Sequence, residues 1–326
     1  MGIPATSDNI PGTLVLRDNN GRFASGNYTD VKDFGAVGDG ATDDTAAIQA
    51  AIDFVEAQGG GTVLFPATGD FYACKQAFTV GDNTALTGEG SGSSCLKWTS
   101  VPDVTMSYPG QVSGGGVRGF LNKDYVTGNR NIVISGLKLD FSLIPGDSGL
   151  GDRPRQIVYF YNCEDVVVEN CYILSSGGCV CNVNTRRYRV SNNHCEQIGS
   201  SATSDSMIDQ WDGSEDGVIS GNIIDGKSIS RSCILATGSA TLGEAGAGPI
   251  NNIMVSGNTI TNSGDFAIWM QGRIDGCYNV NIIHNTIRDC VGSAISIMTL
   301  IRVNVCHNYI DGAGKSGVSC ANETLG

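Results

Sequence analysis

The stretch VSGNTI, residues 255–260, decides the fold because close variants of it recur through the second half of the chain. Each copy is apolar at both ends and small or polar in the middle, and copies follow one another at intervals of 22 to 36 residues. Aligned on the fourth position of the motif, the column reads Leu137, Cys171, Asn193, Asn222, Asn258, Asn285 and Asn308. A constant motif joined by connections of variable length indicates a structural repeat.

Each repeat also contains further short apolar pieces. NNIMV (251–255) precedes the motif, and pieces such as CILAT (233–237) and FAIWMQ (266–271) follow earlier copies of it. Two or three short strands per repeat, separated by turn residues, predict the coils of a parallel β-helix. Coils stack about 4.8 Å apart, so an Asn column can hydrogen-bond to the coils above and below. We expect an all-β solenoid in which the Asn column is structural.

Composition and charge narrow the class of protein. The 326 residues include 45 Gly and only 16% charged residues, as expected for many short strands and turns. A net charge of −13 and no basic cluster argue against nucleic-acid binding. The first residues lack the pattern of a signal peptide, and no apolar run approaches a bilayer span, so no membrane insertion is expected. The twelve scattered cysteines are expected to be free thiols.

The front of the chain predicts one helix. An Asp/Thr-rich start at 42–45 precedes Ile48, Ile52 and Val55, which share one helical face, and GGG at 59–61 ends the pattern. We expect this helix, at about 43–57, to cover the open apolar end of the first coil. The predicted organisation is an N-terminal arm over 1–28 and a β-helix domain over 29–326.

The segments DFGAVGDGATDDTAAIQAAID (33–53) and GGGTVLFP (59–66) resemble the N-terminal signature of the pectate-lyase-like right-handed β-helix superfamily. That superfamily includes polygalacturonases, alginate epimerases and bacteriophage tailspike depolymerases, so the resemblance implies a right-handed parallel β-helix. It does not choose among hydrolases, lyases, epimerases and non-enzymatic adhesins, because one scaffold carries all of them.

The segment GTLVLRDNNGRFASG (12–26) resembles the start of the folded part of phage tail-fibre and tailspike proteins. This resemblance implies a virion tail or appendage protein, made in a host cytoplasm without a signal peptide. It also implies a homotrimer that binds a host surface polysaccharide and contacts other tail proteins through its N-terminal arm.

Alternation within the strands that follow the motif predicts an outward site. Ile208, Ile234 and Ile268 are expected to face inward, so their neighbours Asp209, Leu235 and Trp269 should form one outward column. Four residues earlier on the same face, the sequence predicts a second column. It consists of Asp205, Arg231 and Asp265.

These columns predict a groove for a sugar chain. Glycoside hydrolysis uses two carboxyl groups, and backbones two coils apart, as at Asp205 and Asp265, are separated by about 10 Å, near the inverting range of roughly 6.5–9.5 Å. We expect Asp205, Asp209 and Asp265 to be the catalytic residues. A lyase would instead need a base and a cation, for which Arg231 or Arg273 could serve.

Trp211 and Trp269 could stack on sugar rings, and Arg231 could hold an acidic sugar in a bidentate contact. The alternative for the DGSEDG stretch (212–217) is a solvated loop, because Asp favours turns. TSDSMID (203–209) resembles the NTDGID element of polygalacturonases, with Asp205 at the matching acid. The paired-Asp and GHG elements of that family have no full counterpart, which argues against polygalacturonase activity.

No cofactor motif occurs, and none is expected. His284 and His307 precede the Asn column on consecutive copies and should stack outside, but two ligands make a poor metal site, so no metal is predicted. The sequence thus favours a tailspike-like protein that binds and depolymerises a host surface polysaccharide. The alternatives are a non-enzymatic receptor-binding or structural β-helix and a cellular polysaccharide lyase or epimerase.

Overall fold

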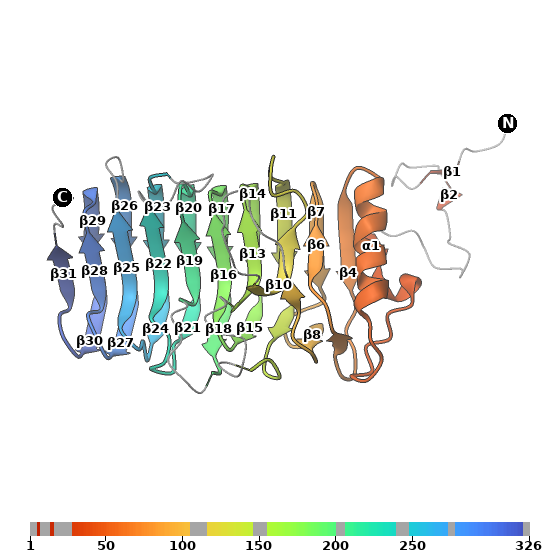
Figure 1. Cartoon of the computed structure of the whole chain (residues 1–326), viewed down its shortest axis with the longest axis horizontal. Coiled ribbons are helices and arrows are strands. Elements are labelled where there is room, and N and C mark those ends of the chain that lie inside the picture. Colours follow the sequence, from red (N-terminus) through yellow and green to blue (C-terminus); the bar gives the residue numbers. More distant parts are fainter. Residues whose placement is uncertain are drawn as a thin grey trace.

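The computed structural model confirms a parallel β-helix with one α-helix at its N-terminal end (Figure 1). It describes residues 5–6, 14–15, 28–104, 116–145, 155–199, 206–238, 248–272 and 278–321. Two short strands, β1 (Ala5–Thr6) and β2 (Leu14–Val15), pair in parallel within the part predicted as an arm. The boundary predicted between the arm and the β-helix domain stays a prediction.

Three long sheets run the length of the solenoid, and each coil contributes one strand to each sheet. Sheet 1 contains β6 (Phe78–Val80), β9 (Asp103–Val104), β10 (Gly116–Asn122), β13 (Arg155–Tyr161), β16 (Gly178–Val183), β19 (Ile208–Trp211), β22 (Ser232–Gly238), β25 (Phe266–Gly272), β28 (Ile295–Met298) and β31 (Val318–Ala321). Its strands pair in parallel except β9, which is antiparallel to β10.

Sheet 2 contains β3 (Tyr28–Asp30), β4 (Gly61–Phe65), β7 (Thr84–Gly88), β11 (Arg130–Ser135), β14 (Glu164–Glu169), β17 (Arg186–Ser191), β20 (Glu215–Ser220), β23 (Asn251–Ser256), β26 (Tyr278–Ile283) and β29 (Ile301–Cys306). Sheet 3 contains β5 (Tyr72–Cys74), β8 (Cys95–Trp98), β12 (Lys138–Asp140), β15 (Tyr172–Ser175), β18 (His194–Gln197), β21 (Ile223–Asp225), β24 (Thr259–Thr261), β27 (Thr286–Cys290) and β30 (Tyr309–Ala313). The sequence motif forms the corner between sheets 2 and 3.

The Asn column is buried in that corner and bonds as predicted. Asn222 Oδ1 accepts hydrogen bonds from the backbone N–H of Asn193, at 3.0 Å, and from its side-chain amide. Asn222 Nδ2 in turn donates to Asn258 Oδ1 and to the carbonyl of Val190. The residue before each column member has a positive φ, which turns the chain sharply; these residues are Gly136, Asn170, Asn192, Gly221, Gly257, His284 and His307. The column therefore satisfies backbone donors that this turn leaves without a strand partner.

The predicted helix is confirmed as α1 (Thr45–Ala57), which follows the short 3-10 helix η1 (Val31–Phe34). Its apolar face is buried against the first coils. Asp44, at the N-cap, is buried and accepts hydrogen bonds from the N–H groups of Val37, Gly38 and Ala73. The acidic start of the helix thus ties the entry loop to β5, the first strand of sheet 3, which explains the Gly- and Asp-rich signature physically.

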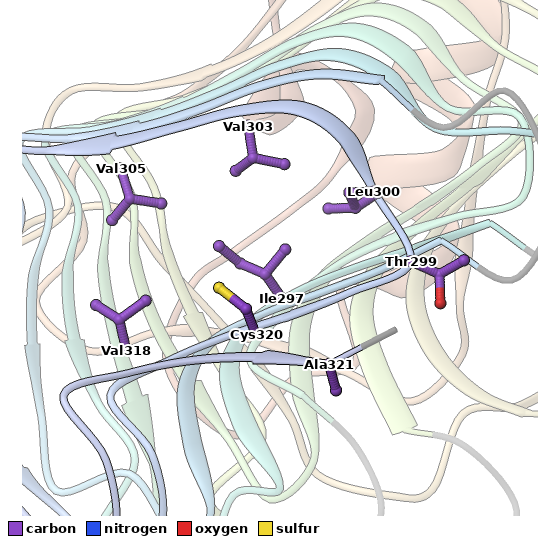
Figure 2. A pocket seen from close by; sticks show the side chains of 8 residues that line it. All are labelled: Ile297, Thr299, Leu300, Val303, Val305, Val318, Cys320 and Ala321. Carbon is purple, nitrogen blue, oxygen red and sulfur yellow. The ribbon is translucent and has the colours of Figure 1, made fainter. Parts of the chain in front are cut away.

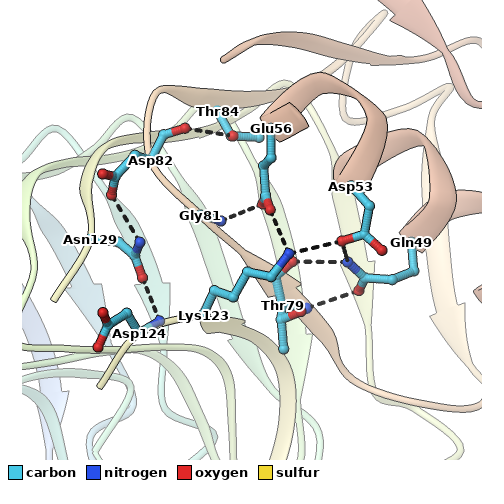
Figure 3. Close-up of polar contacts among 10 residues, drawn as sticks. All are labelled: Gln49, Asp53, Glu56, Thr79, Gly81, Asp82, Thr84, Lys123, Asp124 and Asn129. Carbon is cyan, nitrogen blue, oxygen red and sulfur yellow. Dashed lines mark hydrogen bonds and ion pairs between the residues drawn. The ribbon is translucent and has the colours of Figure 1, made fainter. Parts of the chain in front are cut away.

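Polar contacts also hold α1 against the side of the first coils (Figure 3). Lys123 Nζ lies 2.8 Å from Glu56 Oε2 and 3.1 Å from Asp53 Oδ1. Gln49 exchanges two hydrogen bonds with the backbone of Thr79. The helix is held by its apolar face and by this polar rim.

The opposite end of the described solenoid is hollowed (Figure 2). A cavity of ≈ 400 Å³ opens there, lined by Ile297, Thr299, Leu300, Val303, Val305, Val318, Cys320 and Ala321. No α-helix of the described residues covers this end. Within the described part of the chain, no helix is long and apolar enough to cross a membrane.

Candidate functional site on sheet 1

Sheet 1 has the register that the sequence predicts. Asp209 on β19 pairs with Leu235 on β22, which pairs with Trp269 on β25. The isoleucines beside them, Ile208, Ile234, Ile268 and Ile295, are fully buried in the main core. Asp209, Leu235 and Trp269 belong to the opposite face of the sheet, as alternation requires.

The expectation that this column is open to solvent is wrong. Asp209 is 2% exposed, Leu235 4% and Trp269 6%. Trp269 is covered because the ring of Phe266 packs 5.0 Å from it and the guanidinium of Arg231 lies 4.6 Å from its centroid. An outward direction therefore does not make a side chain accessible on this sheet.

Trp211 lies in the neighbouring outward column, where it pairs with Thr237. It is half-buried and packs against a second apolar cluster on the same face. That cluster consists of Leu121, Tyr125, Tyr159, Tyr161 and Cys181. Trp211 thus extends an aromatic surface on the earlier coils and does not stand beside Trp269.

Arg231 and Asp265 flank the start of β25. The carbonyl of Arg231 accepts the N–H of Phe266 at 3.1 Å, so Arg231 lies directly beside Asp265 in the register of the sheet. Arg231 is exposed, and its stacking on Trp269 is a cation–π contact that holds the guanidinium in place. The Asp265 side chain is 40% exposed, and Lys315 Nζ lies 3.8 Å from its Oδ1.

Lys315 was missed by sequence reasoning. The connection from sheet 3 to sheet 1 has the same length on the coils that carry Asp265 and Lys315, so their alignment was present in the sequence. Counting three residues back from the paired strand positions Ile268, Ile295 and Val318 would have revealed the alignment.

Two predicted site residues, Asp205 and Arg273, lie outside the described residues. The predicted separation of Asp205 from Asp265 stays a prediction. Asp209 lies two coils before Trp269, and Asp265 lies on the same coil as Trp269 but four residues earlier. The backbones of Asp209 and Asp265 are therefore roughly 16 Å apart. That distance exceeds the roughly 6.5–9.5 Å of paired glycosidase carboxyl groups. Asp209 and Asp265 therefore do not form such a pair by their backbone positions.

Metal and thiol chemistry find little support in the described residues. Among them, no group of three or more His, Cys, Asp and Glu side chains could hold a metal ion. His284 and His307 stack face to face with ring centroids 5.0 Å apart, as the sequence predicts. Burial raises the pKa of Cys233 to about 12, which keeps this thiol protonated and unreactive.

Comparison with known proteins agrees with this architecture. Residues 28–176 match the family described as "Rhamnogalacturonase A/epimerase, pectate lyase-like". An exopolygalacturonase of Yersinia enterocolitica superposes with a TM-score of 0.67 at 14% identity, covering 94% of this chain and 72% of that one. The tailspike of E. coli bacteriophage HK620, solved with a pentasaccharide, gives a TM-score of 0.66 at 15% identity, covering 90% and 59%.

Over a short segment, the sequence identity to a curated relative is higher than to these solved structures. Mannuronan C5-epimerase AlgE3 of Azotobacter vinelandii is 50% identical over 78 residues, which is 21% of this chain and 4% of the epimerase. The chain thus matches only a small part of that relative's length. The chain thus has the parallel β-helix fold, and its residues 28–176 are similar to a pectate-lyase-like family. It is similar in fold to a phage tailspike and to an exopolygalacturonase.

Proposed function

We propose that this protein binds an acidic polysaccharide on the outward face of sheet 1 and cleaves it, as a tailspike-like virion protein acting on a host surface polysaccharide. The observation that carries the proposal is the exposed guanidinium of Arg231, held on the buried ring of Trp269 and adjacent to the half-exposed carboxylate of Asp265.

This arrangement suits an anionic sugar for physical reasons. Trp269 occupies one face of the guanidinium, which leaves the N–H edge to form the bidentate contact that a carboxylate prefers. Arg231 forms no ion pair with another described residue, so a ligand need not displace a partner within the described chain. The net charge of −13 would repel an acidic polymer elsewhere, and a local cation counters this repulsion.

Bond cleavage requires a second group beside Asp265. In hydrolysis one carboxylic acid protonates the leaving oxygen while a carboxylate activates water. In β-elimination a base removes the proton beside the sugar carboxylate, and a cation such as Arg231 stabilises the charge that develops. Asp265 supplies one group in either scheme, and Asp205 supplies the second by its sequence position.

The test is an assay of the purified protein against a panel of bacterial surface polysaccharides and polyuronates. Released reducing ends report cleavage, and absorbance near 235 nm separates elimination from hydrolysis. Asp265→Asn and Asp205→Asn should abolish release. Asp311→Asn, an exposed carboxylate on sheet 3, is the matched control and should keep full activity. Binding of a polymer without release would assign a receptor-binding role.

The match to the mannuronan epimerase favours a second candidate, a polyuronate epimerase or lyase. Both reactions begin by removing the proton next to the carboxylate, so both suit Arg231 beside a carboxylate base. Epimerisation releases no reducing ends. It is detected as deuterium incorporated from heavy water into polymannuronate, and absence of both incorporation and unsaturated products would exclude this candidate.

The virion role has its own measurements. A tailspike-like protein should be a homotrimer that is attached to other tail proteins through residues 1–28. Light scattering after size-exclusion chromatography measures the mass in solution. A trimer that loses binding to tail proteins, but not to polysaccharide, when residues 1–28 are removed would support this role; a monomer would contradict it.

A further inference from the structure

Asp265, Gly292 and Lys315 hold the same position on three successive coils. The strands that follow them, β25, β28 and β31, pair in parallel without a shift in register. The N–H of Lys315 donates to the carbonyl of Gly292 at 3.1 Å, which keeps this alignment into the loops. Lys315 is therefore two coils from Asp265.

The gap between them exists because residue 292 is glycine. A Cβ added at Gly292 would collide with Asp265 Oδ1 and with the Asp265 backbone. Without that atom, Lys315 extends past Gly292 until its Nζ lies 3.8 Å from Asp265 Oδ1. This separation is longer than the roughly 2.7–3.2 Å of a hydrogen bond. With Lys315 69% exposed, the ion pair is loose and contributes little to stability.

Arg231 is on the other side of Asp265. It precedes Asp265 by one coil, and its guanidinium is fixed on Trp269. Along the helix axis the order is therefore a cation, a carboxylate, a glycine gap and a second cation. Three coil steps separate the Arg231 and Lys315 backbones, which corresponds to about 14 Å.

We propose that Arg231 and Lys315 form a two-cation strip that runs along the β-helix axis and binds two negatively charged groups of one acidic polysaccharide chain. This proposal rests on the proposed function and adds the path of the polymer and a second binding residue. A polymer carboxylate replaces the loose contact of Lys315 with Asp265 and leaves Asp265 facing the sugar chain. Lys315 is thus a specificity residue, and it selects polymers with repeated negative charge.

The strip makes a prediction about ligand length. A short oligosaccharide can reach Arg231 alone, whereas a longer one reaches both cations. Lys315→Gln should therefore weaken the binding of long acidic oligosaccharides on the order of tenfold and leave short ones unchanged. Arg231→Gln should weaken both. Lys315→Arg should retain binding, because the charge and the reach are kept.

The experiment is isothermal titration of the whole protein with polygalacturonate and polymannuronate oligosaccharides of two to eight units, alongside their carboxyl-reduced forms. Arg302→Gln is the matched control, because Arg302 is an exposed cation on sheet 2, away from the strip. The strip also predicts that Lys315→Gln lessens the salt dependence of binding to the long oligosaccharides. Circular dichroism confirms that each variant is folded.

The outcomes separate the two proposals. If wild-type protein binds acidic oligosaccharides and Lys315→Gln binds the long ones as tightly as the wild type does, the two-cation strip is wrong and the proposed function stands. If the wild type binds neither these oligosaccharides nor any polymer of the surface panel, both are overturned. If carboxyl-reduced forms bind as tightly as acidic ones, the polymer is not recognised by its charge, and the strip is again wrong.

Discussion

The ring of Tyr188 lies where a Cβ of Gly217 would be, on the next coil of the solenoid. Tyr188 is fully buried in the main core, on β17, and Gly217 is its register neighbour on β20. Its hydroxyl is buried and has no hydrogen-bond partner among the described residues. The coil with Tyr188 therefore accommodates a large aromatic ring because the next coil has a glycine, with no side chain, at the same position.

Gly217→Ala should destabilise the protein by about 1–3 kcal/mol, because the added methyl group overpacks the core against Tyr188. Urea unfolding followed by circular dichroism measures the loss. The double variant Gly217→Ala with Tyr188→Leu should recover part of it, since the smaller side chain leaves room. Equal losses in the single and double variants would show that the ring is not the cause.

Tyr188→Phe alone should leave stability unchanged or raise it by up to about 1 kcal/mol. The substitution removes a buried hydroxyl that has no partner in the described part of the chain, and it keeps the packing of the ring. The same unfolding experiment measures this change. A clear loss of stability would mean that the hydroxyl forms a hydrogen bond in solution, for example to an internal water molecule.

Asn222→Leu should be among the most damaging single changes to the fold. Asn222 Oδ1 accepts from the backbone N–H and the side-chain amide of Asn193; without it the N–H would be buried without its partner, and the amide would keep only its bond to the carbonyl of Val168. At about 1–3 kcal/mol for each lost bond, the expected loss is roughly 2–6 kcal/mol. Asn304→Ala, which removes an amide contact at the surface, is the control and should cost under about 1 kcal/mol.

The Asn column illustrates what the sequence could predict. A polar residue recurring between apolar strand ends must be satisfied by its own neighbours, so its hydrogen bonds follow from the repeat alone. Inward and outward faces of sheet 1 also follow from alternation, as the pairing of Asp209 with Leu235 confirms. Both features depend only on local periodicity.

The solvent exposure of the site residues could not be predicted from local periodicity. Whether Trp269 is open to solvent depends on the side chains of Phe266, at the start of β25, and of Arg231, just before β22. Lys315 was missed because its contact with Asp265 crosses two coils. Periodicity determines the strands, whereas these contacts depend on which side chains neighbouring coils place beside one another.

Arg187→Gln should lower thermal stability at neutral pH and have no effect in acid. The hydrogen bonds from Arg187 hold the pKa of Asp165 below its ordinary value of 3.8. A carboxylate with a lowered pKa stabilises the folded state above the unfolded-state pKa, and this contribution is lost as the pH falls through the folded-state value. The difference in melting temperature from wild type should therefore be small but measurable at pH 7 and shrink as the pH falls below 3.8.

Arg302→Gln provides the comparison, because Arg302 occupies the same column on a later coil and forms no ion pair with another described residue. It should leave the melting temperature unchanged at every pH. High salt should also reduce the effect of Arg187→Gln, since both partners are exposed. An effect of Arg187→Gln that is the same at pH 7 and pH 3 would point to lost packing and not to the ion pair.

Removing Glu56 should lower the free energy of unfolding more than removing Lys123, its partner in the polar contact that holds α1. Glu56 is mostly buried and accepts from both Lys123 Nζ and the backbone N–H of Gly81, so Glu56→Ala leaves a backbone donor without its partner and should cost about 1–3 kcal/mol. Lys123 is half exposed, and Lys123→Ala should cost under about 1 kcal/mol.

Hydrogen exchange measured by mass spectrometry locates the effect. Glu56→Ala should speed exchange in α1 and the first coils, while the coils around β22 and β25 keep their protection. Uniformly faster exchange along the solenoid would mean that the helix stabilises the whole structure cooperatively. If Glu56→Ala and Lys123→Ala lower the free energy of unfolding equally, the ion pair, and not the Gly81 contact, holds the helix in place.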